Sequence, residues 1–162
     1  MGTKGRDFVE SVARIIPGYK GYSEREKRRD MDKLVRETMA KSIDAARHDL
    51  DAVLADLGRR GAFEHLETIE SIRRRAGTEA ERLRRAPAGF SGFFDTIQVE
   101  TEQLDRIHEH DSRLGEQAQA FQSAVDALKT QLDAEHLQAA AQAIERIEDH
   151  VRRRENVMKG VE

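Results

Sequence analysis

Three residues in the second half of the chain have the types and spacing of a metal-binding or acid–base cluster. Asp105, His108 and Asp111 follow one another at intervals of three positions, so a helix would bring their side chains together. Di-iron bundles use such clusters, but they need a Glu from each of two helices and a Glu-x-x-His from each of two more. Only Asp133 and His136 repeat the acid-x-x-His spacing. We therefore expect no metal and no cofactor.

Asp111 also interrupts an apolar stripe that otherwise contains no charge. A charged residue at such a position is expected to pair, since an unpaired charge inside a bundle is costly. We expect Asp111 to form a buried pair that sets the helix register, with an arginine of a neighbouring helix as its partner. Whether Asp105, His108 and Asp111 are more than a structural polar cluster stays open at this point.

Two other stretches resemble parts of catalytic motifs without completing them. The Gly-Phe-Ser-Gly run at 89–92 lacks the Gly-x-Ser-x-Gly spacing of a nucleophile turn and has no preceding strand. The run at 17–21 lacks the Gly-Lys-Ser/Thr of a phosphate loop. The chain has no cysteine. The sequence therefore predicts a protein that is not an enzyme, and no small-molecule substrate is inferred.

Basic residues gather in four runs, at 25–29, 73–75, 82–85 and 152–154. Binding of single-stranded nucleic acid would place aromatic side chains among them, and only the first run has tyrosines ahead of it. The later runs lie near glutamates, and the net charge of the chain is −3. We therefore expect opposite charges to face each other between helices or to be solvated, and a nucleic-acid partner is not favoured.

The elements that must position these residues are long helices. The chain has 162 residues, 36% charged and 5% aromatic, which is typical of one helical domain with a core. It has no apolar run of the roughly 18 residues that a membrane span needs. The lack of cysteine fits a reducing compartment, so a cytoplasmic location is expected.

Apolar residues recur at steps of three and four, which predicts an all-α, antiparallel four-helix bundle with helices at about 23–58, 62–85, 100–129 and 134–158. Asp133 is expected to cap the last of them. Residues 24–33 are nearly all charged, which indicates a coiled-coil-like extension. The predicted stripes consist of Val35, Met39, Ile43, Ala46, Leu50, Val53 and Leu57; Ala62, Phe63, Leu66, Ile69, Ile72, Ala76, Ala80 and Leu83; Leu104, Ile107, Asp111, Leu114, Ala118, Phe121, Val125 and Leu128; and Leu137, Ala140, Ile144, Ile147, Val151 and Met158.

Residues 1–22 form a separate unit in this interpretation. A short amphipathic helix is expected at about 3–16, and Pro17 ends it because its ring disfavours helical geometry in the residue before. The bundle then occupies 23–162. The N-terminal helix packs on the bundle or lies on a membrane surface, and the sequence leaves both open.

Aromatic residues concentrate in two glycine-containing turns, at 15–22 and 87–95. We expect them chiefly to specify the fold and secondarily to bind a partner. The aromatic residues of the two turns are Tyr19, Tyr22, Phe90, Phe93 and Phe94.

The run Ile-Pro-Gly-Tyr-Lys-Gly-Tyr at 16–22, with the charged run at 24–29 after it, resembles a motif of an uncharacterised family of small helical bacterial proteins. The Gly-Phe-Ser-Gly-Phe-Phe-Asp turn at 89–95, with Leu104 and Asp105 after it, is similar to a second motif of that family. The resemblance implies a helical fold and relatives encoded beside membrane-associated assembly proteins, but no activity. It favours a scaffold role.

The sequence thus predicts a non-enzymatic helical scaffold or protein-interaction module of a cytoplasmic assembly with one or more protein partners, and a second copy of the chain is one candidate. One alternative is a peripheral membrane adaptor that uses the N-terminal helix, and another is a nucleic-acid-binding helical protein. The predicted contact residues are Tyr19, Tyr22, Arg25, Arg28, Arg29, Phe90, Phe93 and Phe94.

Overall fold

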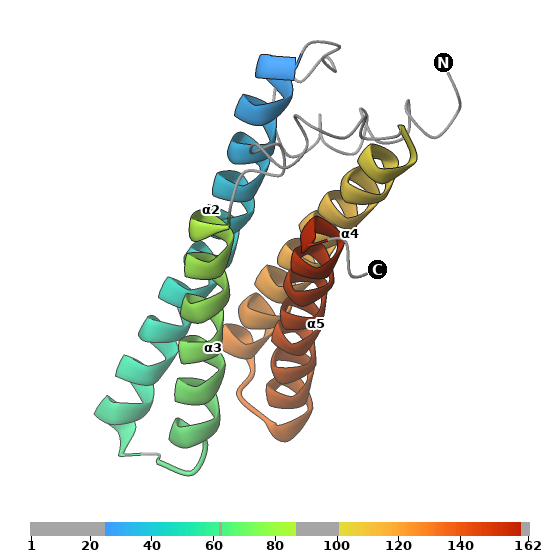
Figure 1. The fold of residues 1–162 in the computed structure, drawn as a ribbon. Coiled ribbons are helices and arrows are strands. Elements are labelled where there is room, and N and C mark those ends of the chain that lie inside the picture. Colours follow the sequence, from blue (N-terminus) through green and yellow to red (C-terminus); the bar gives the residue numbers. More distant parts are fainter. Residues whose placement is uncertain (1–24, 62, 87–100, 160–162) are drawn as a thin grey trace.

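A computed structural model describes residues 25–61, 63–86 and 101–159 of the chain. Four helices make up this part: α2 (Arg25–Arg60), α3 (Leu66–Arg85), α4 (Thr101–Thr130) and α5 (Ala134–Lys159). They pack side by side as an all-α four-helix bundle, which confirms the predicted fold class (Figure 1). The expected N-terminal helix at 3–16 and both aromatic turns lie outside the described residues.

Two antiparallel hairpins form the bundle, α2 with α3 and α4 with α5 (Figure 1). The first hairpin turns at Gly61, whose φ of 66° lies in the left-handed region that glycine adopts without strain. At the second corner the amide of His136 donates to Asp133 Oδ1 at 2.9 Å. The predicted cap at Asp133 is therefore confirmed.

The hairpins lie against each other with α2 beside α4 and α3 beside α5. Side-chain contacts cross this junction, and in three of them the two residues are 73 positions apart: Gln122 with Asp49, Arg75 with Glu148 and Arg82 with Glu155. A constant separation means that the joined helices run in the same direction. Each helix therefore has one antiparallel neighbour and one parallel neighbour, an arrangement that short connections alone do not predict.

The core follows the predicted stripes. All seven stripe residues of α2 are buried, as are those of α4 from Asp111 to Leu128 and those of α5 from Leu137 to Val151. Phe121 is a fully buried aromatic residue in the second half of α4. The side chains of Leu104, Ile107 and Met158, and residue Ala62, lie outside the described part.

One predicted stripe residue is misplaced. Phe63 is 66% exposed, because α3 begins at Leu66 rather than near residue 62. The amide of Leu66 donates to the carbonyl of Phe63 at 3.2 Å, so residues 63–65 belong to the turn that follows Gly61. The chain needs these residues to complete its reversal, and the prediction of a buried Phe63 was wrong.

Candidate functional site

The predicted contact residues are only partly described. Arg25, Arg28 and Arg29 lie in the first two turns of α2, but their side chains lie outside the described part. Tyr19, Tyr22, Phe90, Phe93 and Phe94 lie outside the described residues, as do the side chains of Asp105 and His108. The roles assigned to them stay predictions.

Asp111 forms the buried ion pair expected of it. Its Oδ1 accepts a hydrogen bond from Arg154 Nε on α5 at 2.9 Å, and the two side chains are 5% and 3% exposed. The register-setting pair with an arginine of a neighbouring helix is thereby confirmed as a contact. Arg154 lies three positions after Val151 and so continues the apolar stripe of α5. This spacing could have shown from the sequence that Arg154 is buried, unlike the arginines beside it.

Two further buried charges were not predicted. On α2, Arg36 Nη1 donates to the carbonyl of Leu83 at 3.0 Å. On α3, Glu79 accepts hydrogen bonds from Arg82 at 2.9 Å, and its burial raises the pKa of its carboxyl above the usual range although Arg82 opposes the shift. Among the described residues each helix thus carries one buried charged side chain. Arg36 and Glu79 lie at the spacing of the apolar stripes, and this spacing was the sequence signal from which their burial could have been predicted.

Two ion pairs join α3 to α5 along the boundary between these helices. Arg75 donates from Nε and Nη2 to the two carboxylate oxygens of Glu148, both at 2.6 Å. Seven positions on, Arg82 donates to both oxygens of Glu155 at 3.2 and 2.9 Å. We call these four residues the α3–α5 paired boundary. Each arginine faces an acid directly, so the two ion pairs join the hairpins.

The α2–α4 and α2–α3 boundaries also match basic with acidic groups. Lys129 Nζ of α4 donates to Asp49 of α2 at 3.0 Å. Arg73 of α3 donates to Asp51 at 3.3 Å, and Arg84 pairs with Asp44. The expectation that opposite charges face each other between packed helices is confirmed for the runs at 73–75 and 82–85.

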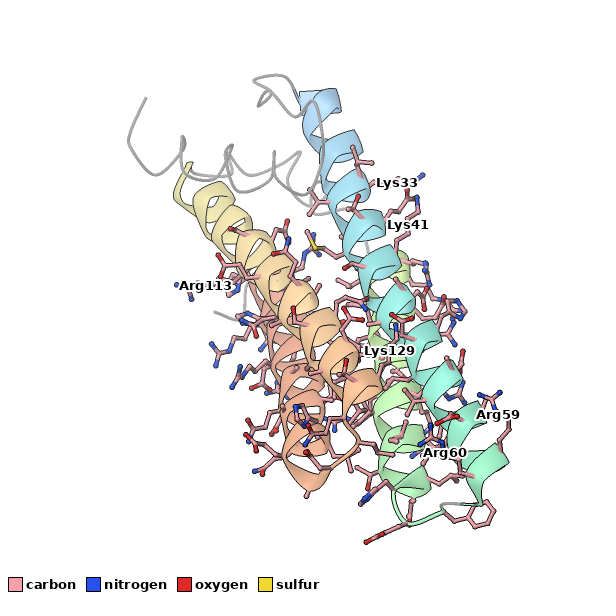
Figure 2. The ribbon with its side chains drawn as sticks, turned by 180° about the vertical axis from the view of Figure 1, so that it is seen from behind. Lys33, Lys41, Arg59, Arg60, Arg113 and Lys129 are labelled. Atoms are coloured by element: carbon pink, nitrogen blue, oxygen red, sulfur yellow. The ribbon has the colours of Figure 1, made fainter. Side chains whose placement is uncertain are left out.

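The outer boundary between α4 and α5 is different. His110, Arg113 and Gln117 recur at steps of three and four on α4, so they share one side of that helix. Arg146, His150 and Arg153 do the same on α5 at steps of four and three. Figure 2 shows Arg113 on the side of α4 that faces away from α2. We call these six residues the α4–α5 cationic boundary.

The two lines of this boundary lie close together. The Asp111–Arg154 bond fixes the register of α4 against α5, and His110 and Arg153 directly precede its two residues. Burial lowers the pKa of His150 below its usual range, and the charges of Arg153, His110 and Arg113 lower it further. His150 Nδ1 and Gln117 Oε1 are buried and have no hydrogen-bond partner among the described residues.

Comparisons with protein-family models, curated proteins and solved structures give no match. The resemblance of the two aromatic turns to a bacterial family therefore stays a prediction. Within the described ranges, no group of three or more His, Asp or Glu side chains could hold a metal ion. No helix in the same ranges combines the length and apolar content needed to cross a membrane.

Proposed function

We propose that this protein is a non-enzymatic scaffold or protein-interaction module of a cytoplasmic assembly, and that the start of α2 is its contact surface. The observation that carries the proposal is the projection of α2 beyond α3. Arg36 donates to the carbonyls of Leu83 and Arg84, in the last turn of α3. Residues 25–35 therefore continue past the end of α3, by about 16 Å at 1.5 Å a residue, as Figure 1 shows.

The surface of this projection suits a partner helix with acidic side chains. Leu34 is a large apolar residue that is 41% exposed, and the side chain of Lys33 beside it is 68% exposed. The segment 25–33 contains five basic residues and three acidic ones. Arginine is enriched among the residues that dominate binding energy at protein interfaces, and an exposed apolar residue gives such an interface its centre.

The pairing of the later arginine runs favours a protein partner over a nucleic acid. Arg75, Arg82 and Arg84 each bond to a carboxylate of the bundle itself. Nucleic-acid affinity depends on basic groups that replace the counterions of phosphates, and paired arginines contribute little to that exchange. This leaves the projecting segment of α2 as the better candidate for contact.

The test begins with affinity purification of the full chain from its native host, followed by binding of the identified partner in purified form. The variant Arg25→Glu/Arg28→Glu/Arg29→Glu should weaken that binding by about tenfold or more, since reversed charges repel an acidic partner. The matched control is Arg59→Glu/Arg60→Glu, at the opposite end of the same helix (Figure 2). Equal effects of the two variants would contradict the proposal.

Sedimentation with liposomes distinguishes the peripheral membrane adaptor from the protein-interaction module. A full chain that sediments with anionic vesicles, together with a chain lacking residues 1–16 that does not, would favour the peripheral adaptor. We expect neither chain to sediment appreciably. That result would leave the protein partner as the occupant of the α2 projection.

A further inference from the structure

The turn of the first hairpin presents an aromatic side chain to solvent. Phe63 is 66% exposed, and within the described part of the chain it and Leu34 are the exposed large apolar residues. Two backbone hydrogen bonds define this turn. The amide of Gly61 donates to the carbonyl of Gly58 at 3.3 Å, and the amide of Leu66 donates to that of Phe63 at 3.2 Å. Phe63 is therefore held on the outside of the bundle by a turn of fixed shape.

This turn lies beyond the end of the second hairpin. The separation of 73 positions that relates α2 to α4 places Thr130, the last residue of α4, beside Leu57 of α2. Helix α2 continues for three more residues, to Arg60, so the turn after it protrudes by nearly one helical turn (Figure 1). A second molecule can therefore approach the turn end-on without meeting the corner between α4 and α5.

Two basic residues precede Phe63. Arg59 and Arg60 stand at the end of α2, and their side chains are each 72% exposed (Figure 2). Both bond to Asp56, so one carboxylate is shared between two guanidinium groups. Exposed ion pairs within a helix contribute little to stability, so these arginines can exchange Asp56 for another acid at small cost.

Two acidic residues follow Phe63. Glu64 and Glu67 are exposed, and neither bonds to a basic group of the described residues. The end of the first hairpin thus carries both signs of charge, with the basic pair before the aromatic residue and the acidic pair after it. We call the set the hairpin tip; it consists of Arg59, Arg60, Phe63, Glu64 and Glu67.

A surface of this kind is complementary to a copy of itself. In a two-fold dimer one patch meets the same patch of the other subunit, so each contact between two residues occurs twice. The basic pair of one hairpin tip can then face the acidic pair of the other, while the two Phe63 rings meet near the axis. An anionic lipid surface would attract the arginines but repel the glutamates, so a second copy matches this patch better.

We propose that the hairpin tip binds the hairpin tip of a second copy of this chain, end to end. The two aromatic rings form the centre of the contact, and the exchanged charges set its orientation. Only the end of one hairpin takes part, so the contact is smaller than the roughly 1,200 Å² of a stable interface, and the dimer is weak. The hairpin tip lies at the opposite end of α2 from the proposed protein contact and does not depend on it.

Sedimentation equilibrium of the full chain over a range of concentrations measures this association. The apparent mass should rise from 18.4 kDa toward twice that value as the concentration increases. Added salt should weaken the dimer, since ions screen exposed charges. Phe63→Ser should raise the dissociation constant by about tenfold or more, because both copies lose the aromatic side chain that the contact buries.

Charge reversal tests the pairing across the axis. Arg59→Glu/Arg60→Glu and Glu64→Arg/Glu67→Arg should each abolish self-association, because like charges then face each other. An equimolar mixture of the two variants should associate at least as strongly as the parent, since each presents the sign that the other lacks. Circular dichroism and thermal unfolding verify that each variant keeps the fold.

Arg74→Glu/Arg85→Glu is the matched control, because it makes the same change of net charge at exposed positions of α3 outside the hairpin tip. This control should associate as the parent does. Three results would overturn the proposal: a parent chain that stays monomeric at every concentration, a Phe63→Ser variant that associates like the control, or a mixture of charge-reversed variants that associates no better than its components.

Vesicles of anionic lipid examine the other occupant of the hairpin tip. A chain that stays monomeric but binds these vesicles, and loses that binding on Phe63→Ser, would assign the tip to a membrane surface and overturn the dimer. Binding of the purified partner at the start of α2 is a separate measurement, which Arg59→Glu/Arg60→Glu should leave unchanged. The failure of either proposal is therefore distinguishable from the failure of the other.

Discussion

Helix α5 borders two neighbours, and its basic and acidic residues are arranged in opposite ways along the two boundaries. Toward α3, Glu148 and Glu155 each accept two hydrogen bonds from an arginine. Toward α4, Arg154 bonds to Asp111 in the core, whereas outside it the line of Arg146, His150 and Arg153 borders a line that contains His110 and Arg113. Both neighbours present arginines to α5, so the difference comes from α5 itself, which presents glutamates toward α3 and basic residues toward α4.

This comparison shows why charge content is a poor guide to function in a helical bundle. The run at 73–75 looks as basic as the run at 152–154, yet Arg73 and Arg75 both bond to carboxylates of other helices. Of the second run, Arg154 is buried against Asp111 while Arg153 stays exposed. Neutralisation across a boundary makes an arginine structural, and no acid of the described residues bonds to Arg153 in that way.

The largest effect should come from the buried pair between α4 and α5. Asp111→Ala removes the buried carboxylate that accepts from Arg154 Nε, and the free energy of unfolding should fall by about 3–5 kcal/mol. Denaturant unfolding measures this loss. The double variant Asp111→Leu/Arg154→Leu removes both charges and should recover most of the stability. A double variant as unstable as Asp111→Ala would show that the pair itself does not explain the loss.

The next effect should have the opposite sign. Gln117→Leu/His150→Leu replaces two buried polar atoms that have no hydrogen-bond partner among the described residues with apolar groups, so the free energy of unfolding should rise by about 1–2 kcal/mol. The same kind of change on the α3–α5 paired boundary, Arg75→Leu, should lower it. A loss of stability in both variants would remove the distinction between the two boundaries.

Two groups on opposite sides of α5, His150 near α4 and Glu79 of α3, should make the stability change with pH in different ways. The folded state holds the pKa of His150 below its unfolded value, so the unfolded state binds protons first and stability falls as pH drops below about 6.5. The folded pKa of Glu79 is raised, so its contribution is present in acid and is lost as pH rises through that pKa.

Single substitutions separate these two responses. His150→Leu should flatten the acid loss of stability, and Glu79→Gln should raise the free energy of unfolding near neutral pH by about 1 kcal/mol relative to its effect in acid. Thermal unfolding across the pH range provides both curves. If Glu79→Gln were more destabilising at neutral pH than in acid, its carboxylate would be held by Arg82 more strongly than burial opposes it.

The sequence predicted those features that depend on one helix at a time. Stripe spacing identified the buried residues of α2 and α4, and an acid before a helix start identified the cap at Asp133. The failure at Phe63 came from a turn that continues past Gly61, which composition does not reveal. Arg36 and Glu79 stand at stripe positions, but their charge argued against burial until their bonding partners were known.

The candidate site could not be predicted in the same way, because it depends on which helices are neighbours. Periodicity places Arg146, His150 and Arg153 on one side of α5, but it does not say that α4 faces them or in what register. The segment between α3 and α4 is long enough to allow either an adjacent or a diagonal return. The register instead comes from contacts such as Asp111 with Arg154.

The smallest effect should come from the ion pair between Arg75 and Glu148. Both groups are partly exposed, so solvent screens them, and a double-mutant cycle with Arg75→Gln and Glu148→Gln should give a coupling of about 0.2–1 kcal/mol. The bidentate geometry, with both distances at 2.6 Å, favours the upper end of that range. Added salt should reduce the coupling, since ions screen exposed charges. The same cycle on Arg153 and His150 should give a coupling of opposite sign once the pH is low enough to protonate His150, because both groups are then cationic. A favourable coupling there would mean that an anion already bridges them.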